Sequence, residues 1–328
     1  MKHLKLFNQE NEYLDALEQL DCPNVSYVIE TDAVYYHPFI ETMIVATYNV
    51  TSSGEEVKLL NRDYTGGGIY GDPVYTFDIN KIEEMHVDGV KLSEPVRSYT
   101  FNEPGEHVVK YKFYDIENAL VFNTIDGSAF YGCTKLTGII IPDGVTSIGD
   151  QAFSDCTSLT SVTIGNGVTS IGGAAFADCS SLTSITIPDS VTSIGSGAFY
   201  ACYLLTSINI PDSVTSIGVA AFMDCTSLKS VTIPDSVTLI GDSAFHNCDA
   251  LTSITIPDGV TSIGEAAFSY CSKLASVYCK PTTPPALDVA FYNNALGRKI
   301  YVPMKSVDVY KAATGWIDYA SDIEGYNF

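Results

Sequence analysis

The sequence predicts a solenoid in which every coil adds one short strand to each of two β-ladders, with helical or 3-10 turns between the strands. Phenylalanine recurs every 23 residues from Phe130 to Phe291 without a slip. Cysteine recurs at the same interval from Cys133 to Cys271. Such strict self-similarity is the signature of a repeat architecture whose units contact only their neighbours. Residues 119–302 are therefore expected to form the solenoid.

The clearest copy of the unit, residues 182–204, reads LTSITIPDSVTSIGSGAFYACYL. Leu182, Ile185 and Ile187 have the spacing of a short strand with its apolar side turned inward. Pro188 must end that strand because proline lacks the ladder N–H. The β-branched segment 191–195 predicts a second strand on the opposite side of the coil. One unit alone cannot bury enough apolar surface to offset the entropy of ordering it, so stability must come from stacking.

The chain outside the repeats divides into three further regions. Residues 1–80 read as a small α+β or mostly β module, with a helix expected over residues 8–21. Residues 81–118 predict an immunoglobulin-like or capping β unit, because an Asp-Gly turn at residue 88 lies between alternating residues. Residues 303–328 predict a C-terminal cap, in which Trp316 covers the last coil or, as the alternative, stacks on a carbohydrate.

Charge excludes several classes of partner. The chain has 39 acidic and 17 basic residues, a net charge of −22, so nucleic acid and anionic membranes are not expected to bind. No run reaches the roughly 20 apolar residues that span a bilayer, so no membrane insertion is expected. The N-terminus also lacks the apolar core of a secretory signal. Either the protein is not exported by that route, or a leader is missing from this sequence.

Seven cysteines form one column of the repeat. Side chains stacked in register should have Cβ atoms about 4.8 Å apart, beyond the roughly 3.5–4.5 Å that a disulfide prefers. We therefore expect buried thiols that act as small apolar groups, with Asn294 in the same position of the last coil. Zinc would need cysteine or histidine clusters at short spacing, which the sequence lacks, so no metal or cofactor is predicted. The column consists of Cys133, Cys156, Cys179, Cys202, Cys225, Cys248 and Cys271.

A row of aspartates follows the prolines, and Asn166 fills its gap. Calcium needs six to eight oxygens around one point, whereas each coil offers one carboxylate in a turn that favours aspartate anyway. Turn chemistry is therefore the preferred interpretation, with calcium as the alternative. The row consists of Asp143, Asp189, Asp212, Asp235 and Asp258.

The first strand of each coil also carries a polar strip with almost no charge. Its side chains flank the inward isoleucines and should line one face of the ladder. They are either solvated positions chosen for β propensity or a shallow docking face for a protein or glycan. The strip consists of Ser161, Thr163, Ser184, Thr186, Ser207, Asn209, Ser230, Thr232, Ser253 and Thr255.

The repeat closely resembles the leucine-rich repeats of BspA-type surface proteins of oral and gut anaerobes. The motif LTSITIPDSVTSIGSGAFYAC carries the resemblance, which covers about residues 119–324. It implies a solenoid of leucine-rich repeats and a protein that is secreted or located at the cell surface. It also implies adhesion to host matrix proteins or to other cells.

Two functions remain open, and neither is enzymatic. The five histidines show no ligand spacing, and no nucleophile with a neighbouring base stands out. The first function is a binding or adhesion module that recognises a host matrix protein or a glycan through the repeat surface. The alternative is a structural or tail-type component of a larger, phage-derived assembly, with the solenoid as a spacer or receptor-binding tip.

Overall fold

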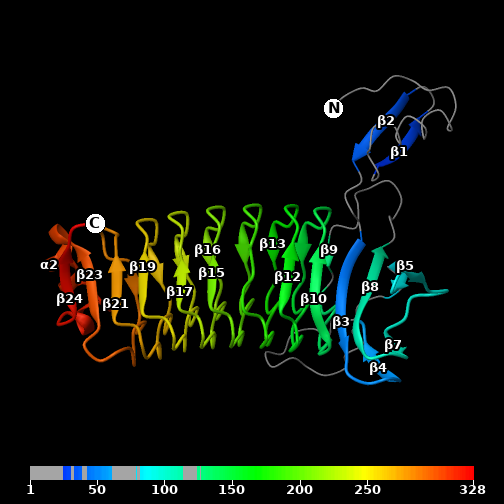
Figure 1. The fold of residues 1–328 in the computed structure, drawn as a ribbon. Coiled ribbons are helices and arrows are strands. Elements are labelled where there is room, and N and C mark those ends of the chain that lie inside the picture. The colour runs from blue at the N-terminus through cyan, green and yellow to red at the C-terminus, as the bar shows by residue number, and fades with distance from the viewer. Residues whose placement is uncertain are drawn as a thin grey trace.

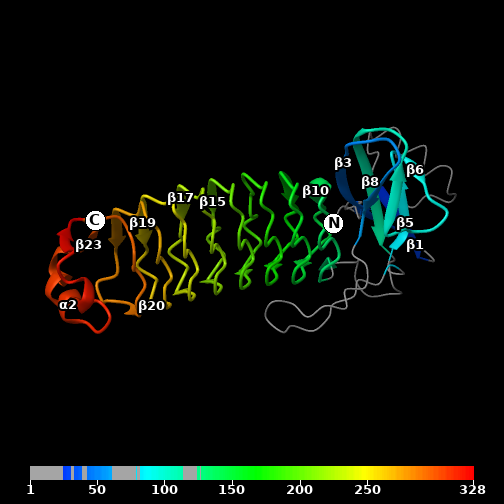
Figure 2. The ribbon, with the colours of Figure 1, turned by 90° about the horizontal axis from the view of Figure 1, so that it is seen from below.

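The computed structural model describes residues 25–30, 33–38, 43–60, 79, 82–113, 124–125 and 127–328. The helix predicted over residues 8–21 lies outside the described residues. From residue 124 onward the chain forms a single row of stacked coils, called rungs below (Figure 1). The predicted solenoid with two β-ladders is confirmed. Figure 2 shows the row running from the N-terminal sheet to the helix α2 (Val307–Ala312) at the other end.

Both ladders are parallel, and each pairing advances the chain by 23 residues, except that of β20 with β22, which advances it by 24. In the second ladder, for example, Ile148 pairs with Ile171, which pairs with Ile194. The first ladder is divided among three hydrogen-bonded sheets, and the rung of Ser184 contributes only a single bridge to Ser207. Its strands are β10 (Leu136–Ile141), β12 (Ser161–Ile164), β15 (Ser207–Asn209), β17 (Ser230–Thr232), β19 (Ser253–Ile256), β21 (Ser276–Cys279), β23 (Lys299–Pro303) and β24 (Ile323–Tyr326). Those of the second are β9 (Thr124–Ile125), β11 (Ser147–Ile148), β13 (Ser170–Ile171), β14 (Ser193–Ile194), β16 (Ser216–Ile217), β18 (Leu239–Ile240), β20 (Ser262–Ile263) and β22 (Ala286–Leu287).

The phenylalanines form a continuous stack inside the solenoid. Neighbouring rings from Phe130 to Phe291 are 5.1–5.5 Å apart between centroids, and their planes differ by 2–11°. All eight side chains are at most 1% exposed. At one end the ring of Tyr111 meets Phe130 edge-on at 5.5 Å. At the other end Tyr319 meets Phe291 edge-on at 5.6 Å, so aromatic side chains from outside the repeat close both ends of the stack.

The segment that carries each phenylalanine consists of tight turns. Bonds from an amide to the carbonyl three residues earlier, such as Cys202 N to Phe199 O, are of the 3-10 type. Two residues per rung have positive φ, which prevents a longer helix. One of these columns is Ser128, Gln151, Ala174, Gly197, Ala220, Ser243 and Ala266, with φ between 51° and 63°.

An antiparallel sheet continues the first ladder at its N-terminal end. Strand β3 (Met43–Val50) pairs with β10 on one side and with β8 (Gly105–Phe113) on the other. Strands β5 (Ile82–Val87) and β6 (Val90–Lys91) complete this six-stranded sheet, and β4 (Glu55–Lys58) pairs with β7 (Ser98–Phe101). A separate hairpin joins β1 (Val25–Glu30) to β2 (Ala33–Pro38). The boundary predicted at residue 80 thus separates strands that the structure joins in one sheet.

Polar contacts stabilise this sheet internally and also hold it against the first rung. The Tyr48 hydroxyl donates to the Leu59 carbonyl at 2.7 Å and lies 2.9 Å from the Tyr111 hydroxyl. Glu55 forms an ion pair with Lys135 of β10's rung at 2.8 Å, and this contact, with bonds from Thr51, lowers the pKa of Glu55 to about 2. Because β3 occupies the outer edge of β10, the first rung presents no open strand there.

The C-terminal segment closes the opposite end. It comprises η2 (Met304–Ser306), α2 and η3 (Ile317–Tyr319). Trp316 is fully buried, its ring centroid lies 6.2 Å from that of Phe291, and its indole N–H donates to the Pro285 carbonyl at 2.8 Å. This burial excludes the carbohydrate-stacking alternative, because no face of the ring meets solvent. Gly315 has a φ of 79°, and a Cβ there would lie 2.1 Å from the Leu287 carbonyl oxygen, so only glycine fits.

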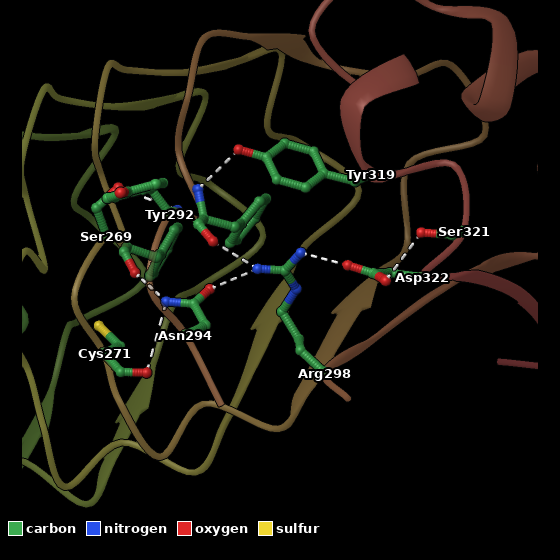
Figure 3. A network of polar contacts seen from close by, with 10 residues as sticks. Ser269, Cys271, Tyr292, Asn294, Arg298, Tyr319, Ser321 and Asp322 are labelled. Carbon is green, nitrogen blue, oxygen red and sulfur yellow. Dashed lines mark hydrogen bonds and ion pairs between the residues drawn. The ribbon is translucent and has the colours of Figure 1, made fainter. Parts of the chain in front are cut away.

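Arg298 links the last rung to the chain that covers it (Figure 3). Its guanidinium donates to the Phe291 carbonyl at 2.5 Å, to the Asn294 side chain at 3.0 Å and to the Asp322 carboxylate at 2.5 Å. The guanidinium also lies over the ring of Tyr319 at 5.0 Å. A buried arginine is stable here because an acid, two oxygen acceptors and an aromatic face surround it.

We expect Phe199→Ala to lower the free energy of unfolding by about 3–5 kcal/mol, because it removes a ring from the middle of the stack and leaves a cavity. Phe199→Leu should cost less, since leucine keeps most of the apolar volume. Urea unfolding followed by circular dichroism measures both. An alanine variant as stable as the leucine variant would contradict the stack's role.

We expect Ala220→Gly to stabilise the protein by up to about 1 kcal/mol, because alanine at positive φ is strained and glycine is not. The neighbouring change Ala221→Gly is the control. Ala221 is buried and is not among the residues with positive φ, so glycine there should destabilise by about 1 kcal/mol. Thermal unfolding of both variants should give shifts of opposite sign.

Candidate functional site

The ten residues of the polar strip lie together on the outer face of the first ladder. All ten are exposed, and they alternate with inward residues such as Val162 and Ile164. Parallel pairing joins Ser184 to Ser207 and Ser207 to Ser230, whereas Ser161 pairs with Gly138 and Ser253 pairs with Ser276. The side chains therefore repeat at the strand spacing of about 4.8 Å and form a flat, uncharged array.

The strip side chains differ from those of the neighbouring threonine columns in their hydrogen bonds. Threonines of the adjacent column donate to the carbonyl one rung earlier, as Thr206 does to Thr183 at 3.2 Å. In the second ladder, Thr192 donates to the carbonyl of Thr169 at 3.2 Å, and Thr238 donates to that of Thr215 at 3.3 Å. Within the described part of the chain, none of the ten strip side chains has such a protein partner. Their hydroxyl and amide groups are thus available to a ligand.

The strip ends in an aromatic cluster that the sequence-based prediction did not include. Tyr278 pairs with Thr255, and its ring stacks on that of Tyr301 at 5.0 Å. Tyr326 of β24 meets both rings at 5.5 Å. The signal was present in the sequence, because Tyr278 and Tyr301 follow Thr255 at steps of one unit.

The seven column cysteines are fully buried and free. From Cys156 onward, each thiol donates to the carbonyl of a phenylalanine in the preceding rung, as Cys202 does to Phe176 at 3.2 Å. Asn294 takes over this role in the last rung and donates to Phe268 at 2.8 Å. Burial raises the pKa of Cys133 and of Cys225 to about 12. At neutral pH the thiols of Cys133 and Cys225 therefore stay protonated, the form that is neither a nucleophile nor a metal ligand.

The aspartate row lies in exposed turns. Asp143 accepts the Asn166 amide at 2.7 Å, a bond that supports the next turn. No group of three or more His, Cys, Asp or Glu side chains that could hold a metal occurs among the described residues. Nor does any helix in the described ranges combine the length and apolar character needed to cross a membrane. Of the histidines, His107 pairs with Asp88 at 2.7 Å in the N-terminal sheet, far along the chain from the strip.

Comparison with known proteins identifies the repeat. A family model for the BspA type leucine rich repeat region matches residues 123–208 and 192–313, with 6 copies. These residues make up more than half of the chain. No curated protein matches the chain.

Solved structures of bacterial proteins share the repeat. A leucine rich cell surface protein of Faecalibacterium prausnitzii is 35% identical over 56% of this chain and 60% of its own, with a TM-score of 0.46. A leucine rich repeat protein of T. pallidum is 29% identical over 50% of this chain and 66% of its own, with a TM-score of 0.37. A leucine-rich repeat protein from Bacteroides ovatus is 23% identical over 75% of this chain and 70% of its own, with a TM-score of 0.39. The matched region thus spans less than two thirds of the length of the Faecalibacterium prausnitzii protein and of the T. pallidum protein.

We expect the eight described cysteines to resist iodoacetamide at pH 8 in the native protein, because their thiols are buried and inaccessible to the reagent. An exposed cysteine, with its usual pKa of about 8.5, would react. Peptide mapping by mass spectrometry gives the labelling of each residue, and the urea-unfolded protein is the positive control. Native labelling of Cys179 or Cys202 would contradict this expectation.

Proposed function

Since the chain belongs to the BspA-type leucine-rich repeat family, we propose that it is a non-enzymatic adhesion module that recognises a host matrix protein or a glycan. Repeat regions of this family are typically binding modules without catalytic activity, and they generally bind proteins. The proposal places the protein at the cell surface or in the secreted fraction. The cell-surface protein of Faecalibacterium prausnitzii supports this location by similarity.

The binding face in this proposal is the polar strip. The observation that carries it is the contrast in hydrogen bonding: neighbouring threonine columns bond to the backbone, whereas the strip side chains have no protein partner in the described chain. Uncharged hydroxyls at a regular spacing suit a ligand with repeated polar groups, either an extended polypeptide or a glycan chain. The Tyr278–Tyr301 stack at the end of the strip adds an aromatic surface, which binding interfaces favour.

The strip differs in charge from the rest of the solenoid surface, which is acidic. Residues 119–278 carry 13 acidic and 3 basic side chains, and several of the acidic ones lie in the turns at the edges of the ladders. The strip itself has no charge, so a neutral ligand can approach it without desolvating a carboxylate. Shape and hydroxyl chemistry, rather than charge, would then set specificity.

We expect Thr186→Lys combined with Thr232→Lys to weaken binding to immobilised matrix proteins or glycans at least tenfold. The two long cations would stand on the flat strip and displace the ligand from it. Binding is measured by surface plasmon resonance against a panel of matrix proteins and on a glycan array, with circular dichroism to verify folding.

The matched control is Ser193→Lys combined with Leu239→Lys, at two exposed positions whose side chains form no hydrogen bond to the described residues of the preceding rung. It adds the same charge at the same rung spacing, but on the second ladder. This variant should bind like the unaltered protein. Equal loss in both variants would indicate a general charge effect and would contradict a role for the strip.

A further inference from the structure

Two residues of one rung depart from the repeat on the outer surface. Tyr203 and Leu204 are 44% and 49% exposed. The equivalent residues are Ser180 and Ser181 one rung earlier, and Thr226 and Ser227 one rung later. The fold therefore does not need large side chains here, since its neighbours stack without them. Exposed apolar side chains that serve no packing purpose are typical of a binding surface.

An apolar groove is lined by Tyr200, three residues before Tyr203. Its walls are Tyr200 and Val219, and Val219 is 48% exposed. Val219 also departs from the repeat, since Ser196 and Asp242 hold its position in the adjacent rungs. The groove has a volume of about 360 Å³, which small residues leave open: Gly173, Ala174, Ala177, Gly197 and Ala220.

Asp178 connects the groove to Tyr203. It follows Ala177, which lines the groove, and its amide donates to the carbonyl of Tyr200 at 2.8 Å. Its carboxylate is close enough to Tyr203 to act on that hydroxyl: burial, followed by the charges of Asp178 and Asp224, raises the pKa of Tyr203. Asp178 therefore lies next to a residue that lines the groove and also acts on the ring of Tyr203.

The charge of this surface is negative and unbalanced. Burial, followed by repulsion from Asp155 and Asp224, raises the pKa of Asp178. Among the described residues, no lysine, arginine or histidine forms an ion pair with any of these three aspartates. A positive charge supplied by a partner would relieve the repulsion, and the exposed ring of Tyr203 offers it a cation–π contact.

We propose that the groove, together with Tyr203 and Leu204, binds a peptide segment in which a lysine or arginine lies next to a large apolar residue. The apolar side chain enters the groove between Tyr200 and Val219 or packs on Leu204. The cationic side chain lies between Asp178 and Tyr203. This surface consists of turn residues rather than of the ladder strip, so it acts independently of the adhesion face proposed above.

The test uses three fluorescein-labelled decapeptides: alternating lysine and leucine, lysine and serine, and glutamate and leucine. Fluorescence anisotropy measures their binding to the full chain. The lysine–leucine peptide should bind most tightly. Tyr203→Thr combined with Leu204→Ser installs the residues of the next rung, so folding should be retained, and binding should weaken at least tenfold. Val219→Ser, the residue of the preceding rung, should weaken it as well.

Two controls distinguish this surface from others. Leu296→Ser changes a fully exposed leucine that does not line the groove and should leave binding unaltered. The Thr186→Lys, Thr232→Lys variant should also retain peptide binding, so the two proposals can fail separately. The inference is overturned if the Tyr203→Thr, Leu204→Ser variant binds as tightly as the original chain. Equally tight binding of the lysine–serine peptide, or no binding of any peptide, would also overturn it. Sedimentation that shows a dimer lost in the same variant would instead assign the surface to self-association.

Discussion

The stack of phenylalanines is the interaction on which the rest of the structure depends. Each ring can lie parallel to the next at 5.1–5.5 Å only if successive rungs have the same length and the same register. A single inserted residue inside a unit would move the ring out of the stack and turn the inward side of a strand outward. The constant spacing of 23 residues is thus a packing constraint, and the bonds from cysteine thiols to phenylalanine carbonyls reinforce it.

A stack of identical rungs leaves both of its ends unpaired, and the protein covers each end differently. At the N-terminal end, β3 turns the parallel ladder into an antiparallel sheet, and Tyr111 covers the first ring. At the C-terminal end, Trp316 and Tyr319 cover the last ring, and Arg298 ties the covering chain to the last rung. Since neither cover repeats, each one fits only its own end and limits the solenoid to a fixed number of rungs.

The repeat separates residues that hold the rungs together from exposed residues that are not needed for packing. Inward side chains fill the core, and two threonine columns bond from rung to rung. The strip side chains do neither, and in the patch around Tyr203 the exposed side chains of Tyr203 and Leu204 are not needed for packing, so we propose both surfaces for recognition. The two surfaces differ in chemistry: the strip is neutral and regular, whereas the patch is apolar, acidic and confined to the rungs near residue 200. In the two proposals, a single solenoid thus presents two unlike binding surfaces.

The sequence by itself determined the solenoid, its two ladders, the inward phenylalanines and the exposure of the strip, because each follows from a spacing that repeats within one unit. Only the tertiary structure revealed what depends on contacts between units or between distant segments. The joining of β3 to β10 brings together residues about 90 positions apart, and no local pattern indicates that pairing. The groove likewise arises where small residues of several rungs align beside Tyr200 and Val219. The charges of Asp178 and Asp224 meet the ring of Tyr203 only because stacking places three successive rungs side by side.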